Sequence, residues 1–139
     1  MRLQPIIDRL QSAGFVTLGG IIEFAGLTQA PPAGRLPAAF VVPGSDQANR
    51  SERVGVTDQK VLHELSVVLL LNGNSRPGAS AISEQLETLS KAVLERLVGW
   101  TPPDMSGALQ FASGRLVRAD AGVVAWAIGF TTTSHLRKV

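Results

Sequence analysis

The sequence contains no cysteine among its 139 residues, and this single absence removes several kinds of chemistry. Disulfides, thiolate zinc sites and a cysteine nucleophile are all excluded. Tyrosine is absent as well, and only two histidines occur. With so few ligands and bases we expect no metal and no cofactor. A chain of this length can bury about two-thirds of its unfolded surface, so it needs no disulfide or metal to hold its fold.

Long hydrophobic runs and an excess of one charge are also missing. Apolar runs such as Val67–Leu71 are far too short to cross a bilayer. The first ten residues carry charges within their apolar stretch and lack a small-residue cleavage pattern, so we expect no signal peptide and no membrane contact. Thirteen Lys and Arg against eleven Asp and Glu give a net charge of +2. They are scattered along the chain, whereas a nucleic-acid binder usually gathers them on one face.

Two segments have the periodicity of amphipathic helices. From Leu3 to Leu10 apolar residues recur at the i, i+3, i+4, i+7 spacing, and Gly14 is the expected stop. The second helix begins near a Ser80 cap and ends at Gly99. Its apolar stripe is formed by Ile82, Leu86, Leu89, Val93 and Leu97.

Short apolar runs predict strands at Ile21–Ala25 and at Ala38–Val42, the second closed by Pro43–Gly44. In Val61–Leu71 one face carries His63 among apolar residues, and the other face becomes apolar only towards the end. This pattern is typical of a strand that is half-buried at its start and covered on both faces at its end.

The C-terminal third predicts further strands. Leu109–Phe111 and Arg115–Arg118 are two strand segments joined by a bulge at Ser113–Gly114, and Val123–Thr132 is the last strand. The order of elements predicts one α+β domain over residues 1–139, with a mixed or antiparallel sheet and two amphipathic helices packed on one face.

The polar segment Ser45–Gln59 has almost nothing to bury. We expect a long exposed loop or the tip of an extended hairpin. Loops of this length are often functional, but they are also often flexible, and the sequence leaves both interpretations open.

No constellation of residues indicates catalysis. His63 and His135 have no clustered carboxylate partner and make a poor metal site, and His63 fits a polar position at the end of a core face. Nucleophile-elbow and phosphate-loop motifs are absent, and the Gly19–Gly20 and Gly73–Gly78 segments lack the Lys-Ser/Thr of a phosphate loop. We therefore expect a protein that is not an enzyme.

Three blocks in the C-terminal half carry a resemblance. Leu94 to Pro102 reads LERLVGWTP, Leu109 to Leu116 reads LQFASGRL, and Gly122 to Thr132 reads GVVAWAIGFTT. In this order they resemble the tail terminator, or tail completion, family of long-tailed bacteriophages and Mu-like prophages. The N-terminal half is similar as well, through Leu3–Leu10 and the Leu36–Pro43 segment. The last strand departs from the family, because small residues stand where aromatic and charged ones are expected.

The resemblance implies a structural virion protein assembled in the bacterial cytoplasm. It implies a ring of identical subunits, hexameric in that family, that caps the last ring of the tail tube and stops its growth. Its partners would be further copies of itself, the tail tube protein and the head–tail connector in the neck, with DNA only passing through the ring without sequence preference. No cofactor is implied.

A ring subunit needs two different surfaces that contact its neighbours. Apolar residues on both faces of Val67–Leu71 and the small residues of the last strand can serve as contacts, or both can be core. The candidate contacts between subunits or rings are Arg50, Arg53, Lys60, Val68, Leu70, Arg115 and Arg118. Two other functions fit the sequence: another neck or tube subunit, and a small nucleic-acid-binding module, whose affinity would fall steeply with salt.

Overall fold

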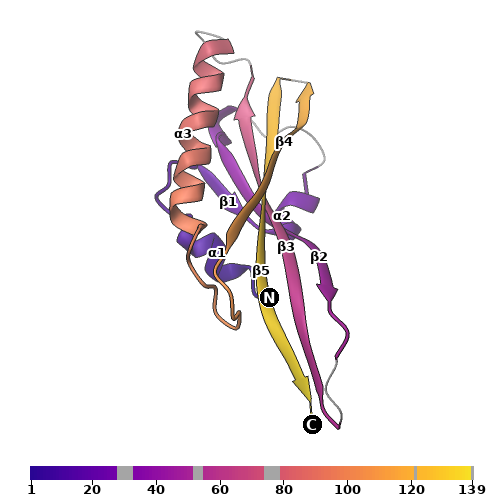
Figure 1. The fold of residues 1–139 in the computed structure, drawn as a ribbon. Helices are drawn as coiled ribbons and strands as arrows, with labels where there is room; N and C mark the ends of the chain where they lie inside the picture. Colours follow the sequence, from indigo (N-terminus) through magenta and orange to yellow (C-terminus); the bar gives the residue numbers. More distant parts are fainter. Residues whose placement is uncertain (28–32, 52–54, 74–78, 121, 139) are drawn as a thin grey trace.

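The computed structural model describes residues 1–27, 33–51, 55–73, 79–120 and 122–138. A five-stranded sheet with the order β1-β2-β3-β5-β4 forms its centre (Figure 1). β1 (Thr17–Gly19) runs parallel to β2 (Ala38–Ala48). β3 (Thr57–Asn72), β5 (Val123–Lys138) and β4 (Gln110–Asp120) follow as antiparallel neighbours. The sheet is therefore mixed, and β1 and β4 are its two edges.

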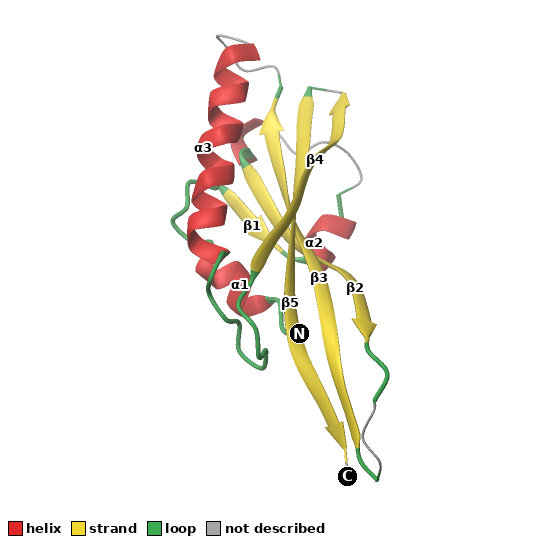
Figure 2. Ribbon diagram, viewed as in Figure 1, coloured by secondary structure: helices red, strands yellow, loops and turns green. Residues whose placement is uncertain are grey.

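Helices lie on both faces of this sheet, but unequally. α1 (Gln4–Arg9) and the long α3 (Ala79–Leu97) cover one face, as Figure 2 shows. The short α2 (Ile21–Ala25) lies on the other face, and a 3-10 turn, η1 (Ala33–Arg35), precedes β2. The predicted α+β fold with two amphipathic helices on one face is confirmed, and α2 is an additional element. None of the described helices meets the length and hydropathy needed to span a membrane.

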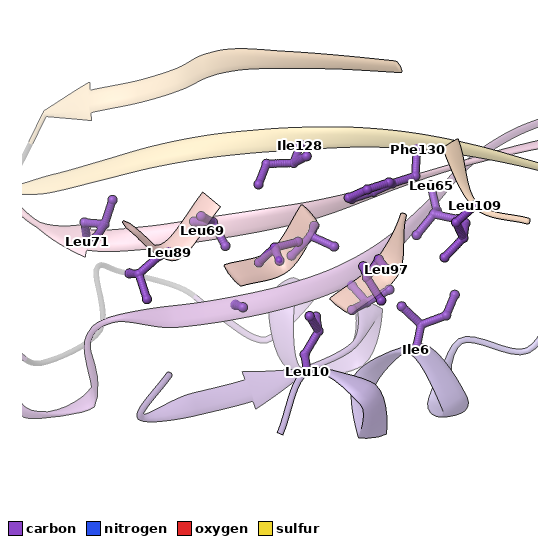
Figure 3. Close-up of a cluster of buried hydrophobic side chains, with 14 residues drawn as sticks. Ile6, Leu10, Leu65, Leu69, Leu71, Leu89, Leu97, Leu109, Ile128 and Phe130 are labelled. Atoms are coloured by element: carbon purple, nitrogen blue, oxygen red, sulfur yellow. The ribbon is translucent and has the colours of Figure 1, made fainter. Parts of the chain in front are cut away.

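The main core lies between α1, α3 and the sheet. Figure 3 shows buried side chains from both layers meeting there, among them Ile6 and Leu97 from the helices and Leu69 and Phe130 from the strands. A second cluster lies on the opposite face, where Phe24 of α2 packs against Phe40 with their ring centroids 5.6 Å apart. β3 contributes to both clusters, which confirms that its end is covered on both faces.

The prediction of a strand at Ile21–Ala25 is wrong, because these residues form α2. The backbone N–H of Gly20 donates to Glu23 Oε2 at 2.9 Å, which satisfies one of the free amides at the helix start. A short apolar run does not distinguish a strand from a one-turn helix, and the glutamate three residues after Gly20 is the signal that does. The strand of this region is β1, immediately before α2.

β2 is longer than predicted. It continues past Pro43–Gly44 to Ala48, because a register shift between Pro43 and Asp46 absorbs the irregular residues. Ser45–Gln59 is therefore the tip of an extended hairpin, which was one of the two predicted possibilities. Residues 52–54 lie outside the described residues.

Two smaller boundaries also differ. α1 ends at Arg9 with Leu10 as its C-cap, so Gly14 is not its stop; Gly14 adopts a positive φ of 108° in the following turn. β4 has two register shifts, between Phe111 and Ser113 and between Leu116 and Arg118, where one bulge was expected.

Candidate assembly surfaces

The first surface is a hairpin arm, defined as residues 45–60 and 134–138. β3 and β5 remain paired from Asn72–Val123 at one end to Thr57–Lys138 at the other. Figure 1 shows the C-terminal end of β5 beside the start of β3, both extending beyond the helices and β4. None of the described side chains at 45–51, 55–60 and 134–138 is buried, so this part of the arm has no core of its own within the chain.

The arm carries more basic than acidic side chains. Arg50 and Lys60 are exposed there, as predicted for contact residues, whereas Arg53 lies outside the described residues. Arg137 and Asp58 form an ion pair at 3.3 Å, and His135 Nδ1 lies 3.8 Å from the same carboxylate. Ion pairs at the surface contribute little to stability. The excess of basic side chains makes the arm suited to contacts with an acidic partner.

A row of three polar side chains ties the strands together at the root of the arm. His63 Nδ1 lies 2.8 Å from Asp46 Oδ1, and His63 Nε2 lies 2.7 Å from Ser134 Oγ. The three residues come from β2, β3 and β5, and His63 is 7% exposed. The expectation that His63 is a polar residue at the end of a core face is met. Its two partners were missed, because they depend on strand register.

Carboxylate, imidazole and hydroxyl in this order are also the components of a hydrolase triad. Catalysis further requires a substrate cleft and donors for an oxyanion. Neither of the two hollows described for this chain, one between α3 and β4 and one at the arm tip, is lined by any of the three residues. We therefore interpret the row as a hydrogen-bonded link between β2, β3 and β5.

This interpretation gives a prediction for His63. His63→Ala removes both hydrogen bonds and should lower the free energy of unfolding by about 1–3 kcal/mol, the range for a buried polar group that loses its partners. Denaturant titration measures the change, and hydrogen exchange of β3 residues 57–60 should accelerate. Lys60→Ala, on the same strand but exposed, is the matched control and should leave stability unchanged. Equal stability of the two variants would contradict the link.

The second surface is the β4 edge of the sheet. All of its described side chains, at positions 110–119, are exposed, including Phe111 at 52% and Leu116 at 56%. Arg115 and Arg118, both predicted contacts, pair in register with Ala127 and Ala125 and so lie on the sheet face opposite α3. An edge strand that exposes large apolar side chains can readily pair with another chain.

A groove separates β4 from α3 and is called here the α3–β4 groove. It has a volume of about 340 Å³ and is lined mainly by Leu86, Ser90 and Leu94 of α3 and by Phe111, Gly114 and Trp126 of the sheet. A Cβ atom at Gly114 would lie 3.1 Å from Trp126 Cζ2, so glycine keeps the floor of the groove clear. The groove is mostly apolar and remains open in the single chain.

The third surface is an apolar knob on α2, defined as Ile21, Ile22 and Glu23. Ile21 is 50% and Ile22 82% exposed, while Phe24 points into the second cluster. Glu23 is exposed, and hydrogen bonds from its own backbone and from that of Gly20 lower the pKa of its carboxyl. The knob therefore presents two apolar side chains beside a fixed negative charge.

Two of the predicted contact residues are not on any of these surfaces. Val68 and Leu70 are each 6% exposed and belong to the second cluster with Phe40 and Ala125. Val68 and Leu70 are therefore core residues, which was the other interpretation that the sequence left open. Among the described residues no group of three or more His, Cys, Asp or Glu side chains is placed to hold a metal ion.

The comparisons with known proteins bear on what these surfaces do. The family model described as "Phage tail terminator protein" matches residues 1–138. The chain belongs to the phage tail terminator family. The predicted resemblance is confirmed, and the chain is a phage tail structural protein of a family that is structural rather than enzymatic.

Other comparisons add less to the family assignment. A search of curated proteins finds no match. Among solved structures, a chain from "Virion of native gene transfer agent (GTA) particle" is similar, with 12% identity and a TM-score of 0.48. The alignment covers 96% of this tail terminator chain and 86% of that chain.

The blocks that carried the family resemblance lie next to the second surface. Gly99, the predicted end of α3, has a φ of +85°, the left-handed conformation that favours glycine. Its N–H donates to Leu109 O at 2.9 Å, which directs the chain towards β4. The residues typical of the tail terminator family therefore build the α3–β4 region.

Proposed function

We propose that this chain forms a ring that caps the last ring of a phage tail tube. The ring has six subunits, as the family resemblance implies. The ring ends tube polymerisation and joins the tail to the head–neck connector, and DNA passes through its centre without sequence-specific contacts. Assembly takes place in the cytoplasm of the host bacterium. The observation that carries the proposal is the family match over residues 1–138.

The shape of the chain supports this function. A capping ring needs contacts between neighbours within the ring and separate contacts along the tail axis. The β4 edge and the α2 knob are two different surfaces suited to contacts between neighbours within the ring. The hairpin arm extends away from the core and is suited to reaching an adjacent ring.

Imaging of tail tubes assembled with the purified chain tests the ring. We expect the chain to be monomeric, or in slow exchange with a ring, in solution, and to form a ring of six copies at one end of each tube. Averaged end-on views measure the symmetry, and tubes assembled without the chain are the control. A stable dimer or trimer on finished tubes would contradict the ring, and binding along the whole tube would indicate a tube subunit instead.

The arm gives a second prediction. Arg50→Glu combined with Arg53→Glu should change the free energy of unfolding by no more than about 0.5 kcal/mol, as is usual for surface positions. The same variant should lower the yield of infectious particles about tenfold or more, because a small loss at each copy is multiplied around a ring. Arg2→Glu combined with Lys91→Glu makes the same charge change at exposed positions outside the arm and is the control. A normal particle yield from the arm variant would refute its role.

A further inference from the structure

The hairpin arm and the α3–β4 groove are complementary in polarity and charge, and they lie at different places on one chain. Figure 1 shows the ends of β3 and β5 in the arm extending beyond the helices and β4. We propose that the arm of one copy lies over the α3–β4 groove of the next copy, with Leu136 in the groove and Lys138 facing Glu87. This inference rests on the proposed ring and specifies one contact between its subunits.

One face of the arm combines an apolar and a basic side chain. Leu136 is 55% exposed, and Lys138 lies two residues further along β5, so the two side chains share a face. Their register partners on β3 are uncharged polar residues, Gln59 and Thr57. Asp58 lies on the opposite face, where it pairs with Arg137. Within the described residues 55–60 and 134–138, the Leu136 face therefore carries a base and no acid.

The groove is apolar with an acidic rim. Leu86, Leu94 and Phe111 form its apolar walls, and Glu87 is the one charged side chain among the described residues that line it. The exposed charged side chains described on α3 are Glu84, Glu87, Lys91 and Glu95. Acids therefore outnumber bases on the helix that forms one wall of the groove. An acidic groove and a basic arm favour contact with each other and disfavour contacts between two arms.

The spacing of the side chains on the two surfaces also agrees. Leu136 and Lys138 are separated by about 7 Å along an extended strand. Glu87 and Ser90, which both line the groove, are separated by about 5 Å along the axis of α3. A leucine placed over Ser90 therefore leaves the Lys138 ammonium within reach of the Glu87 carboxylate.

The contact is heterologous, because every copy carries both surfaces and the two surfaces are different. A heterologous contact passes from copy to copy and produces either a closed ring or an open filament, depending on the rotation between neighbours. It covers the exposed Leu136 and the open groove with each other, and removing apolar surface from water favours association. It uses the β5 end of the arm and does not include Arg50, which remains available to an adjacent ring.

Disulfide trapping tests the contact directly, since the natural chain has no cysteine to interfere. Leu136→Cys places a thiol on the arm, and Ser90→Cys places one in the groove. Under mild oxidation, in solution and on assembled tail tubes, the double variant should give a series of linked oligomers of increasing size. Each single variant should remain unlinked, and an equimolar mixture of the two should stop at linked dimers. A double variant that remains unlinked in both settings would overturn the proposal.

Two matched controls move one thiol at a time. Thr88 is exposed on α3 and does not line the groove, and His135 is exposed on the opposite face of β5 from Leu136. Leu136→Cys with Thr88→Cys, and His135→Cys with Ser90→Cys, should each give no series above background. Equal cross-linking of the test pair and either control would refute the contact. Linked dimers of Leu136→Cys alone, in the yield of the double variant, would also refute it, because they require two arms to meet.

Charge reversal tests the ion pair without a cross-link. Lys138→Glu and Glu87→Lys should each weaken self-association by about two- to fivefold per contact, the effect of an exposed ion pair. Sedimentation at high protein concentration measures the change. Both positions are exposed, so the melting temperature should stay the same. The double reversal recreates the pair with opposite polarity and should restore most of the association, whereas additive losses would show that the two side chains do not meet.

These results are separable from the proposed function. A cross-linked series from a chain that fails to cap tubes would support the contact and refute the capping function. Normal capping with equal cross-linking of the test pair and the Thr88 control would refute the contact alone. If the tube or connector protein protects Ser90→Cys from thiol reagents while other copies of this chain do not, the groove belongs to that protein and the proposal fails.

Discussion

Replacing Phe130 with alanine should lower the free energy of unfolding by about 3–5 kcal/mol, the range for deletion of a large buried aromatic side chain. Phe130 is 1% exposed and belongs to the main core together with Leu65, Leu97 and Leu109 (Figure 3). Native domains are stable by only about 5–15 kcal/mol, so the loss removes a large fraction of the total. Denaturant titration of the purified variant measures it.

The structure offers a matched control in the neighbouring strand. Phe111 pairs in register with Phe130 but is 52% exposed. Phe111→Ala should therefore change stability by about 0.5 kcal/mol or less. Because Phe111 is exposed on the β4 edge proposed as a contact within the ring, this control should weaken ring formation while it folds normally. Similar losses of stability in the two variants would contradict the described core.

Replacing Trp100 with alanine should have the second largest effect on folding. Trp100 follows Gly99 at the end of α3 and packs, half-buried, against the main core that contains Val93 and Leu97. Its backbone is also fixed, since Trp100 O accepts a hydrogen bond from Leu109 N at 2.8 Å. Trp100→Ala should cost about 3 kcal/mol, the lower end of the range for large aromatics, because part of the ring faces solvent.

The exposed side of Trp100 has a partner within the chain. The guanidinium of Arg9 lies 4.7 Å from the centre of the ring, so α1 and the α3–β4 joint contact each other there. Arg9→Ala should cost only about 0.5–1 kcal/mol and is the control for this contact. Subunits with Trp100→Ala should fail by misfolding. A Trp100→Ala chain that melts like the natural protein but cannot cap tails would instead place Trp100 in an interface.

Helices and strands with a strong hydrophobic periodicity could be predicted from the sequence. The stripe of α3 and the alternating face of β3 both follow from periodic burial, and Gly99 marks the end of α3 at the predicted place. α2 was mistaken for a strand because a mostly apolar run of five residues is too short to show a helical or a strand period. The continuation of β2 through Pro43 was missed because a register shift, which no local pattern indicates, accommodates the proline.

The surfaces were harder to predict than the fold. Arg50, Lys60, Arg115 and Arg118 are exposed as expected, because charged side chains rarely lie in a core. Val68 and Leu70 are buried in the second cluster, against which Phe24 of α2 packs, and α2 itself was not predicted. The Asp46–His63–Ser134 row and the α3–β4 groove depend on residues far apart in the sequence, so only the assembled sheet brings them together.

The length of tails made without this chain tests the central claim most directly. The gene for the chain is deleted from the phage or prophage that carries it, and the tails in lysates are measured by electron microscopy, with the intact gene supplied in trans as the control. If the chain closes the tail tube, the deletion should give tubes of irregular and excessive length that lack heads, and complementation should restore uniform tails joined to heads. Headless tails of normal, uniform length would show that another protein ends polymerisation, and would contradict the account.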